Sequence, residues 1–214
     1  MEPFQAKLTM AALKAAENVD AYFASLAEEL FQYYVIQKGK TQYWLTDIEF
    51  YQYHKQRRDI ITYPRNCKAG EWFFHPSGVD IAFESFVRKE GKKPTLTDDA
   101  FFGGILVRGI QKKDPKGDIP FDGPMLACEE LFDKFDAFEE VENFPKLVRV
   151  AQALPYEKPE PEKRFNLKKN AEEKVPSILA NNYEPLRDEH LKDELIQAYR
   201  QFWDKEYRYK RYSR

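Results

Sequence analysis

The first clear pattern along the chain has the spacing of a helix. After Asn18, the apolar residues Val19, Phe23, Leu26 and Leu30 lie three or four positions apart. Asparagine is favoured just before the first helical turn, because its side chain accepts a hydrogen bond from a free backbone N–H. The pattern predicts an amphipathic helix that begins after Asn18 and docks on a hydrophobic core.

The next pattern has a period of two. Residues 41–53 are rich in aromatic and aliphatic side chains and follow the two-residue repeat of a β-strand. This repeat puts Glu49 and Tyr51 on one face and Ile48 and Phe50 on the other. A carboxylate within a mostly apolar strand needs a partner or a chemical role, so Glu49 is a candidate functional residue.

The middle of the chain contains further strand signals. Residues 55–68 are basic and include proline, which indicates a loop. The strand-like runs 71–74 and 79–87 follow, separated by a Pro-Ser-Gly turn. A later run, 103–110, is expected to be a buried strand that carries Arg108. The sequence therefore predicts a β-rich middle with two charged residues embedded in apolar strands.

Helical spacing returns in the last part of the chain. We expect a helix over 124–144, an extended proline-rich connection over 151–165 and a final helix over 193–207, followed by a basic and aromatic tail at 208–214. The expected apolar side of the 124–144 helix consists of Leu126, Leu131, Phe135 and Phe138.

Composition narrows the class of protein. The 34 Lys and Arg residues nearly balance 36 Asp and Glu residues, and 15% of the chain is aromatic, which argues against a polycation and against a disordered chain. Two isolated cysteines and three histidines argue against a disulfide scaffold and a metal centre. We find no signal peptide and no long apolar run, and therefore expect a cytoplasmic protein that does not associate with membranes.

Several catalytic signatures are absent from the sequence, among them GxxxxGK[ST], GxGxxG, HExxH and GxSxG. We therefore expect no cofactor and no metal. The remaining candidates are Glu49 and Tyr51, His54 close behind them, the aromatic run 72–75 and Arg108. For Glu49 there is a structural alternative, because it could simply form an ion pair with Arg108 inside the sheet.

Five short motifs, in this order, resemble the alkyladenine (3-methyladenine) DNA glycosylase family. The family's T-E-A-Y, P-R-N, G-x-x-Y-V-Y-x-x-Y-G-M, V-L-L-R-A and G-P-x-K-L-x-x-A-L motifs are similar to residues 47–51, 64–66, 70–79, 105–109 and 123–131. The similarity covers residues 18–131. It implies a single α+β domain with a curved, mostly antiparallel sheet flanked by helices. Within 1–214 we expect a glycosylase-like core at 17–150, the connection at 151–165 and a C-terminal helical segment with its tail at 166–214.

The resemblance also implies a function. Members of the family flip a damaged purine, alkylated or deaminated, out of duplex DNA and hydrolyse its N-glycosidic bond without a cofactor. Carried over, Glu49 is the general base and Arg108 the arginine beside it. The implied base pocket consists of Tyr51, His54, His75 and Phe73, and the implied DNA contacts are Phe74, Arg57, Arg58, Arg65, Asn66 and Lys68. We expect a monomer whose partner is damaged duplex DNA.

Two departures from the family leave other functions open. Pro76 and Ser77 stand where the family has a tyrosine that fills the gap left by the flipped base, and the lysine of the G-P-x-K-L motif is missing. One alternative is a catalytically inactive binding module for nucleic acid or protein. Another is a hydrolase of a small nucleoside or glycoside that pairs Glu49 with Asp47 or Asp80.

The charge balance hides separate charged segments. Residues 55–68, 88–93 and 205–214 are basic, whereas 129–142 is acidic. A net charge of −2 therefore does not exclude a DNA-binding surface, with the acidic segment expected on the far side of the molecule.

Overall fold

One antiparallel sheet organises the protein. The computed structural model describes residues 3–133, 135, 143–165, 167, 169–186 and 188–211. In these residues the strands follow the order β4-β5-β6-β2-β1-β8, with β3 and β9 paired to β2, and β7 to β6. Their bounds are β1 Tyr34–Lys38, β2 Thr41–His54, β3 Arg57–Arg58, β4 Trp72–His75, β5 Gly78–Ala82, β6 Phe101–Lys112, β7 Ile119–Asp122, β8 Lys146–Arg149 and β9 Arg208–Lys210.

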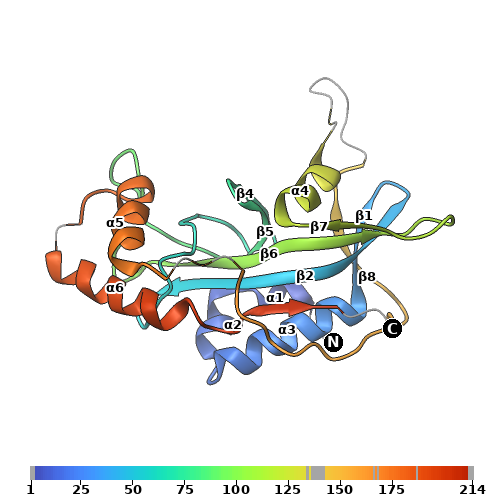
Figure 1. Cartoon of the computed structure of the whole chain (residues 1–214), viewed down its shortest axis with the longest axis horizontal. Helices are drawn as coiled ribbons and strands as arrows, with labels where there is room; N and C mark the ends of the chain where they lie inside the picture. Colours follow the sequence, from blue (N-terminus) through green and yellow to red (C-terminus); the bar gives the residue numbers. More distant parts are fainter. Residues whose placement is uncertain are drawn as a thin grey trace.

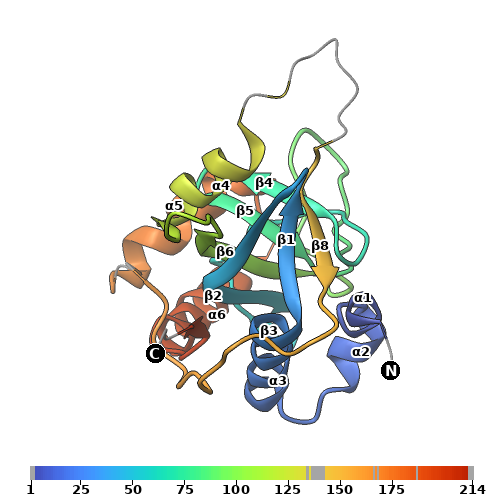
Figure 2. The same ribbon diagram turned by 90° about the vertical axis from the view of Figure 1, so that its right-hand side faces the viewer.

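Helices cover both faces of this sheet (Figure 1). The bounds are α1 Phe4–Lys7, α2 Met10–Ala15, α3 Val19–Tyr33, α4 Pro124–Phe132, α5 Ala171–Asn182 and α6 Glu189–Phe202. The first three helices lie under the long strands, whereas α4 and α5 stand on the opposite face. The expected α+β class with a curved antiparallel sheet is confirmed, and Figure 2 shows how the strands curl.

The predicted first long helix is confirmed as α3. The Asn18 side chain accepts a hydrogen bond of 3.0 Å from the Ala21 N–H and so caps the first turn. Phe23, Leu26 and Leu30 are buried, as the helical spacing indicated. The helix ends at Tyr33, and the chain continues directly into β1.

The long strand β2 and its partner β6 form the centre of the sheet. Their register pairs Glu49 with Leu106 and Phe50 with Ile105, and it shifts on both sides of Asp47. Such a bulge lets a strand re-aim a side chain. Ile48 and Phe50 are buried in the core under α3, while Glu49 and Tyr51 face the other side, as the two-residue period predicted.

The helix predicted over 124–144 is shorter than expected. Helix α4 begins with Pro124 and ends at Phe132, because Asp133 is extended. Leu131 is buried, but Leu126 is exposed rather than part of the apolar side. Phe138 and most of the acidic segment 129–142 lie outside the described residues, as does the prediction about the face on which that segment lies.

The C-terminal part differs most from expectation. Helix α5 was not predicted, and α6 spans Glu189–Phe202 instead of 193–207. The supposed basic tail forms β9, which pairs with β2 opposite residues 47–49. Residues 151–165 contain no helix, and Glu162 forms an isolated bridge with Arg208. Backbone hydrogen bonding to the sheet thus holds a segment that looks like a solvated tail in the sequence.

Two hydrophobic clusters share the long strands. One lies between α1–α3 and the sheet and contains Phe23 and Phe50. The other joins α5 and α6 to the end of β2, through Val175, Leu195 and Tyr53. No helix in the described part of the chain is both long and apolar enough to cross a membrane.

Candidate active site

A row of side chains crosses the sheet on the face that carries α4 and α5. The strand registers align Phe73 with Asp80, Asp80 with Leu106, Leu106 with Glu49 and Glu49 with Arg208. Directly paired residues on antiparallel strands project to the same face. Residues from five strands, far apart in the sequence, therefore meet in one line.

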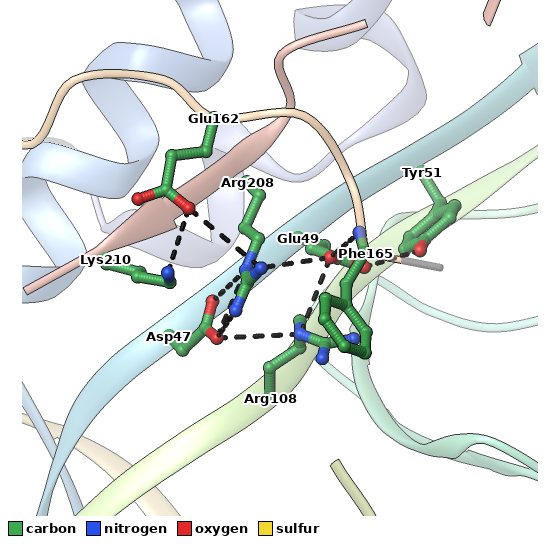
Figure 3. Close-up of polar contacts among 8 residues, drawn as sticks. All are labelled: Asp47, Glu49, Tyr51, Arg108, Glu162, Phe165, Arg208 and Lys210. Carbon is green, nitrogen blue, oxygen red and sulfur yellow. Dashed lines mark hydrogen bonds and ion pairs between the residues drawn. The ribbon is translucent and has the colours of Figure 1, made fainter. Parts of the chain in front are cut away.

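Glu49 is the most enclosed member of this row, with 0% of its surface exposed. Its Oε2 accepts a hydrogen bond of 2.6 Å from the Tyr51 hydroxyl, and its Oε1 accepts one of 2.7 Å from the Phe165 N–H. Arg108 Nε lies 3.5 Å from Oε1 (Figure 3). The carboxylate is thus held in one orientation by two hydrogen bonds and one adjacent guanidinium group.

A second carboxylate completes a network of four charges (Figure 3). Asp47 Oδ2 lies 2.6 Å from Arg208 Nη2 and 3.6 Å from Arg108 Nε. Arg208 Nε is also 3.9 Å from Glu49 Oε1. The expected contact between Glu49 and Arg108 is present, but it belongs to a network of two acids and two arginines.

The segment that precedes α5 covers this network with the side chain of Phe165. Phe165 lies with its ring 4.8 Å from the Arg108 guanidinium and 5.3 Å from that of Arg208. The preceding residue, Arg164, forms a buried ion pair with Asp59, with 2.6 Å between Nη1 and Oδ2. This ion pair anchors the segment that brings the Phe165 N–H to Glu49.

A cavity of about 540 Å³ opens beside the network. Its floor includes Tyr51, Leu106 and Arg108 of the sheet, and its rim includes Ser77 and Pro124. Ligand pockets for small molecules have volumes of this order. The remaining lining residues are Ile61, Thr62, Tyr63, Arg65, His75, Asp80, Phe165, Leu167, Lys174, Ile178, Asn182 and Tyr199.

One wall of the cavity is a buried triad. Asp80 Oδ2 lies 2.5 Å from Arg65 Nη1, and Asp80 Oδ1 lies 2.9 Å from His75 Nε2. Burial opposes ionisation of Asp80, but the Arg65 charge and the His75 hydrogen bond outweigh it and lower the pKa of this carboxyl. The His75 ring stacks on Tyr63 at 4.6 Å, which gives this wall an aromatic surface.

The structure brings two of the four predicted pocket residues to the cavity. Tyr51 and His75 line the cavity, whereas Phe73 lies behind it, stacked on Arg65 at 3.9 Å. His54 is on the opposite face of β2 and stacks on Phe101 at 5.7 Å. The two-residue period accounts for this correction, because position 54 has the parity of Phe50, not of Glu49.

The arginines of the basic loop 55–68 contact other side chains of the protein. Arg57 lies against the rings of Phe23, Phe202 and Tyr207, and Arg58 pairs with Glu194. Arg65 is buried in the triad described above. The tail residues Arg208, Lys210 and Arg211 are also bound to acceptors in the protein.

The remaining predicted DNA contacts, Asn66, Lys68 and Phe74, differ in their exposure and in their contacts with the protein. The Asn66 side chain holds Val87 by two hydrogen bonds to its backbone, which is a structural role. Lys68 is exposed. Phe74 is 51% exposed near the turn of the β4–β5 hairpin, and its ring packs edge-on against Phe132 at 4.8 Å. Arg214 lies outside the described residues.

The alternative carboxylate pair of Glu49 and Asp80 spans two neighbouring strand pairs of the sheet. The two residues are two strands apart, about 10 Å between backbones. Both Asp80 oxygens, however, are bound by Arg65 and His75. Despite its burial, the contacts with Arg65 and His75 lower the pKa of the Asp80 carboxyl, which makes it a weak base, so Asp80 is suited to hold the wall of the cavity rather than to activate water.

Sequence reasoning missed Phe165, Arg164 and the cavity face of α5. Phe165 acts through its backbone N–H, which no residue-type pattern reveals. On α5 a signal was present, since Lys174, Ile178 and Asn182 lie four residues apart and line the cavity together. No group of three or more His, Cys, Asp or Glu side chains that could hold a metal occurs among the residues the structure describes.

Comparisons with known proteins leave the family open. No protein-family model and no solved structure matches the chain. The chain is 25% identical over 128 residues to "Uncharacterized protein L759" of Acanthamoeba polyphaga mimivirus, covering 54% of this chain and 58% of that protein. The chain thus spans little more than half the length of that relative.

Proposed function

We propose that this protein hydrolyses the N-glycosidic bond of damaged purine nucleotides in DNA, with Glu49 as general base. The observation that carries the proposal is a fully buried carboxylate beneath a cavity with aromatic walls. Two hydrogen bonds orient it, from Tyr51 and the Phe165 N–H. Both residues line the cavity, whereas Glu49 itself does not, so a ligand and its water reach the acid only when the Tyr51 or Phe165 side chain moves aside.

Arg108 supports a position for that water. Its Nε atom is buried and donates to no atom of the described residues, although it lies 3.5 Å from Glu49 Oε1. A water that accepts from Arg108 can donate to Glu49. As its oxygen bonds to C1′, Glu49 takes its proton, and the electron pair of the C1′–N9 bond leaves with the purine. The positive charge that develops on the sugar is stabilised by the carboxylate.

Tyr51 supports the same chemistry. Burial, together with the charge of Glu49, raises the pKa of its hydroxyl well above the usual value. The hydroxyl therefore stays protonated and donates to Glu49 throughout the neutral pH range. The stacked rings of Tyr63 and His75 offer a surface for a purine, and such stacking contributes about 1–3 kcal/mol per base.

A second candidate is hydrolysis of a free purine nucleoside or nucleotide by the same acid. The observation that favours it is the engagement of Arg57, Arg58 and Arg65 within the protein, which removes most of the expected basic footprint for a duplex. The chemistry at Glu49 is the same in both cases, so the substrate alone separates them.

The test is base release under single-turnover conditions. We expect wild-type protein to release an alkylated purine or hypoxanthine from a duplex, and Glu49→Gln to slow release by about 100-fold or more. Glu71→Gln, an exposed acid outside the cavity, is the matched control. Release from free nucleosides alone would select the second candidate. Release that is unchanged in Glu49→Gln, or absent with every substrate, would refute Glu49 catalysis and favour a binding module.

A further inference from the structure

Helix α5 contributes a face to the cavity that the chemistry at Glu49 does not use. Lys174, Ile178 and Asn182 are half-buried, follow each other at intervals of four residues and line the cavity. The other side of the helix, through Ala171 and Val175, packs into the core with α6. Helix α5 lies in the part of the chain to which the glycosylase resemblance does not extend.

Lys174 supplies a positive charge without a partner on this face. The acids of the same helical turn are occupied, since Asn170 binds Glu173 and Arg200 binds Glu172. The Lys174 ammonium group has no ion pair with any described residue. The two arginines that line the cavity, Arg65 and Arg108, both lie against carboxylates. Lys174 is therefore the group in this cavity best suited to bind an anion.

Polar groups without partners lie at the other end of the face. The Asn182 amide makes no hydrogen bond with the described part of the chain. Thr62 also lines the cavity, and its hydroxyl is buried, with 1% of the residue exposed and no partner among the described residues. Buried polar atoms in native proteins are normally satisfied, which points to a ligand that bonds to Thr62.

The spacing of these groups fits one ligand class. Asn182 lies eight positions after Lys174, which corresponds to about 12 Å along the helix axis. A purine nucleotide spans a similar length from its phosphate to the edge of its base. Asparagine amides pair with the donor and acceptor of an adenine edge, and the apolar Ile178 lies between the two polar ends.

We infer that the α5 face and Thr62 form a nucleotide-binding surface, in which Lys174 binds the phosphate and Asn182 with Thr62 binds the purine edge. This inference rests on the proposed function, because it names the parts of the substrate nucleotide that the site holds. It assigns substrate recognition to α5 and catalysis to the sheet.

Calorimetric titration of the Glu49→Gln protein tests the phosphate site. The probes are 2′-deoxyadenosine 5′-monophosphate and 2′-deoxyadenosine at low salt. We expect the nucleotide to bind about tenfold more tightly than the nucleoside, a preference that Lys174→Met abolishes and Lys174→Arg retains. Lys192→Met, in a separate groove of the same helical pair, should leave the preference unchanged.

The base site is tested with the same two probes. Asn182→Leu should weaken binding of nucleotide and nucleoside by the same factor, about tenfold, because the phosphate contact is untouched. Equal affinity of the two probes, no binding of either, or an unaffected Lys174→Met protein would overturn the inference. Binding that depends on Lys174 without base release from any substrate would refute only the hydrolase.

Discussion

At the scale of single residues, the site depends on charged side chains that the protein buries and pairs. Asp80 is fixed between Arg65 and His75, and Gly104 leaves room for this arrangement. A Cβ atom at Gly104 would lie 2.8 Å from Arg65 Nη1 and 3.1 Å from Asp80 Cβ. This wall of the cavity therefore requires glycine at position 104 of β6 as well as the ion pair.

The lowered pKa of Asp80 predicts how the stability of the protein depends on pH. Its ion pair stabilises the fold fully above the unfolded pKa of about 3.9, and this contribution is lost as pH falls through the lower folded pKa. Asp80→Asn should therefore be less stable than wild type near neutral pH, and the difference should shrink below about pH 4. Urea unfolding between pH 7 and pH 2.5 measures this. A difference that stays constant with pH would contradict the assignment.

At the scale of elements, the segment 151–165 and β9 connect the C-terminal part to the row of side chains that crosses the sheet. The segment carries Phe165 to Glu49, and β9 carries Arg208 to Asp47. The Arg164–Asp59 ion pair, buried on both sides, anchors the first of these contacts. Elements that look accessory in the sequence thus complete the site.

Removing the anchor should lower the stability of the protein. Arg164→Met leaves Asp59 buried without its partner, and we expect a loss of about 3–5 kcal/mol in the free energy of unfolding. Arg58→Met, which breaks the more exposed pair with Glu194, should cost less than about 1 kcal/mol. Denaturant unfolding compares the two variants. Equal losses would show that the Arg164 pair is no anchor.

At the scale of the whole molecule, the two hydrophobic clusters share the same long strands. Phe50 belongs to the cluster under α3, and Tyr53, three residues further along β2, belongs to the cluster of α5 and α6. The cavity is lined by residues of α5, α6 and the sheet, so its shape depends on the packing of this helical pair on the strands.

This arrangement predicts cooperative unfolding. Leu195→Ala removes a fully buried side chain from the α5–α6 cluster, and we expect a cost of about 2–5 kcal/mol. Because both clusters share β2 and β6, the far-ultraviolet circular dichroism and the tryptophan fluorescence transitions should move together. Separate transitions in the variant would mean that the helical pair unfolds on its own.

The amino-acid sequence by itself determined several local elements, such as α3 and β2, and the candidate acid. The helical spacing after Asn18 and the two-residue period around Glu49 are confirmed, because side-chain periodicity reports directly which face of an element is buried. The same period also assigns His54 to the wrong face for the pocket, a consequence that the sequence contained but motif matching overlooked.

Only the tertiary structure decided what surrounds Glu49. The Phe165 N–H, the Arg208 guanidinium and the α5 wall come from segments more than 100 residues further along the chain. Their positions result from strand pairing and core packing between distant segments, which no local pattern encodes. For this reason the sequence identified the carboxylate, whereas the cavity and its α5 wall emerged only from the fold.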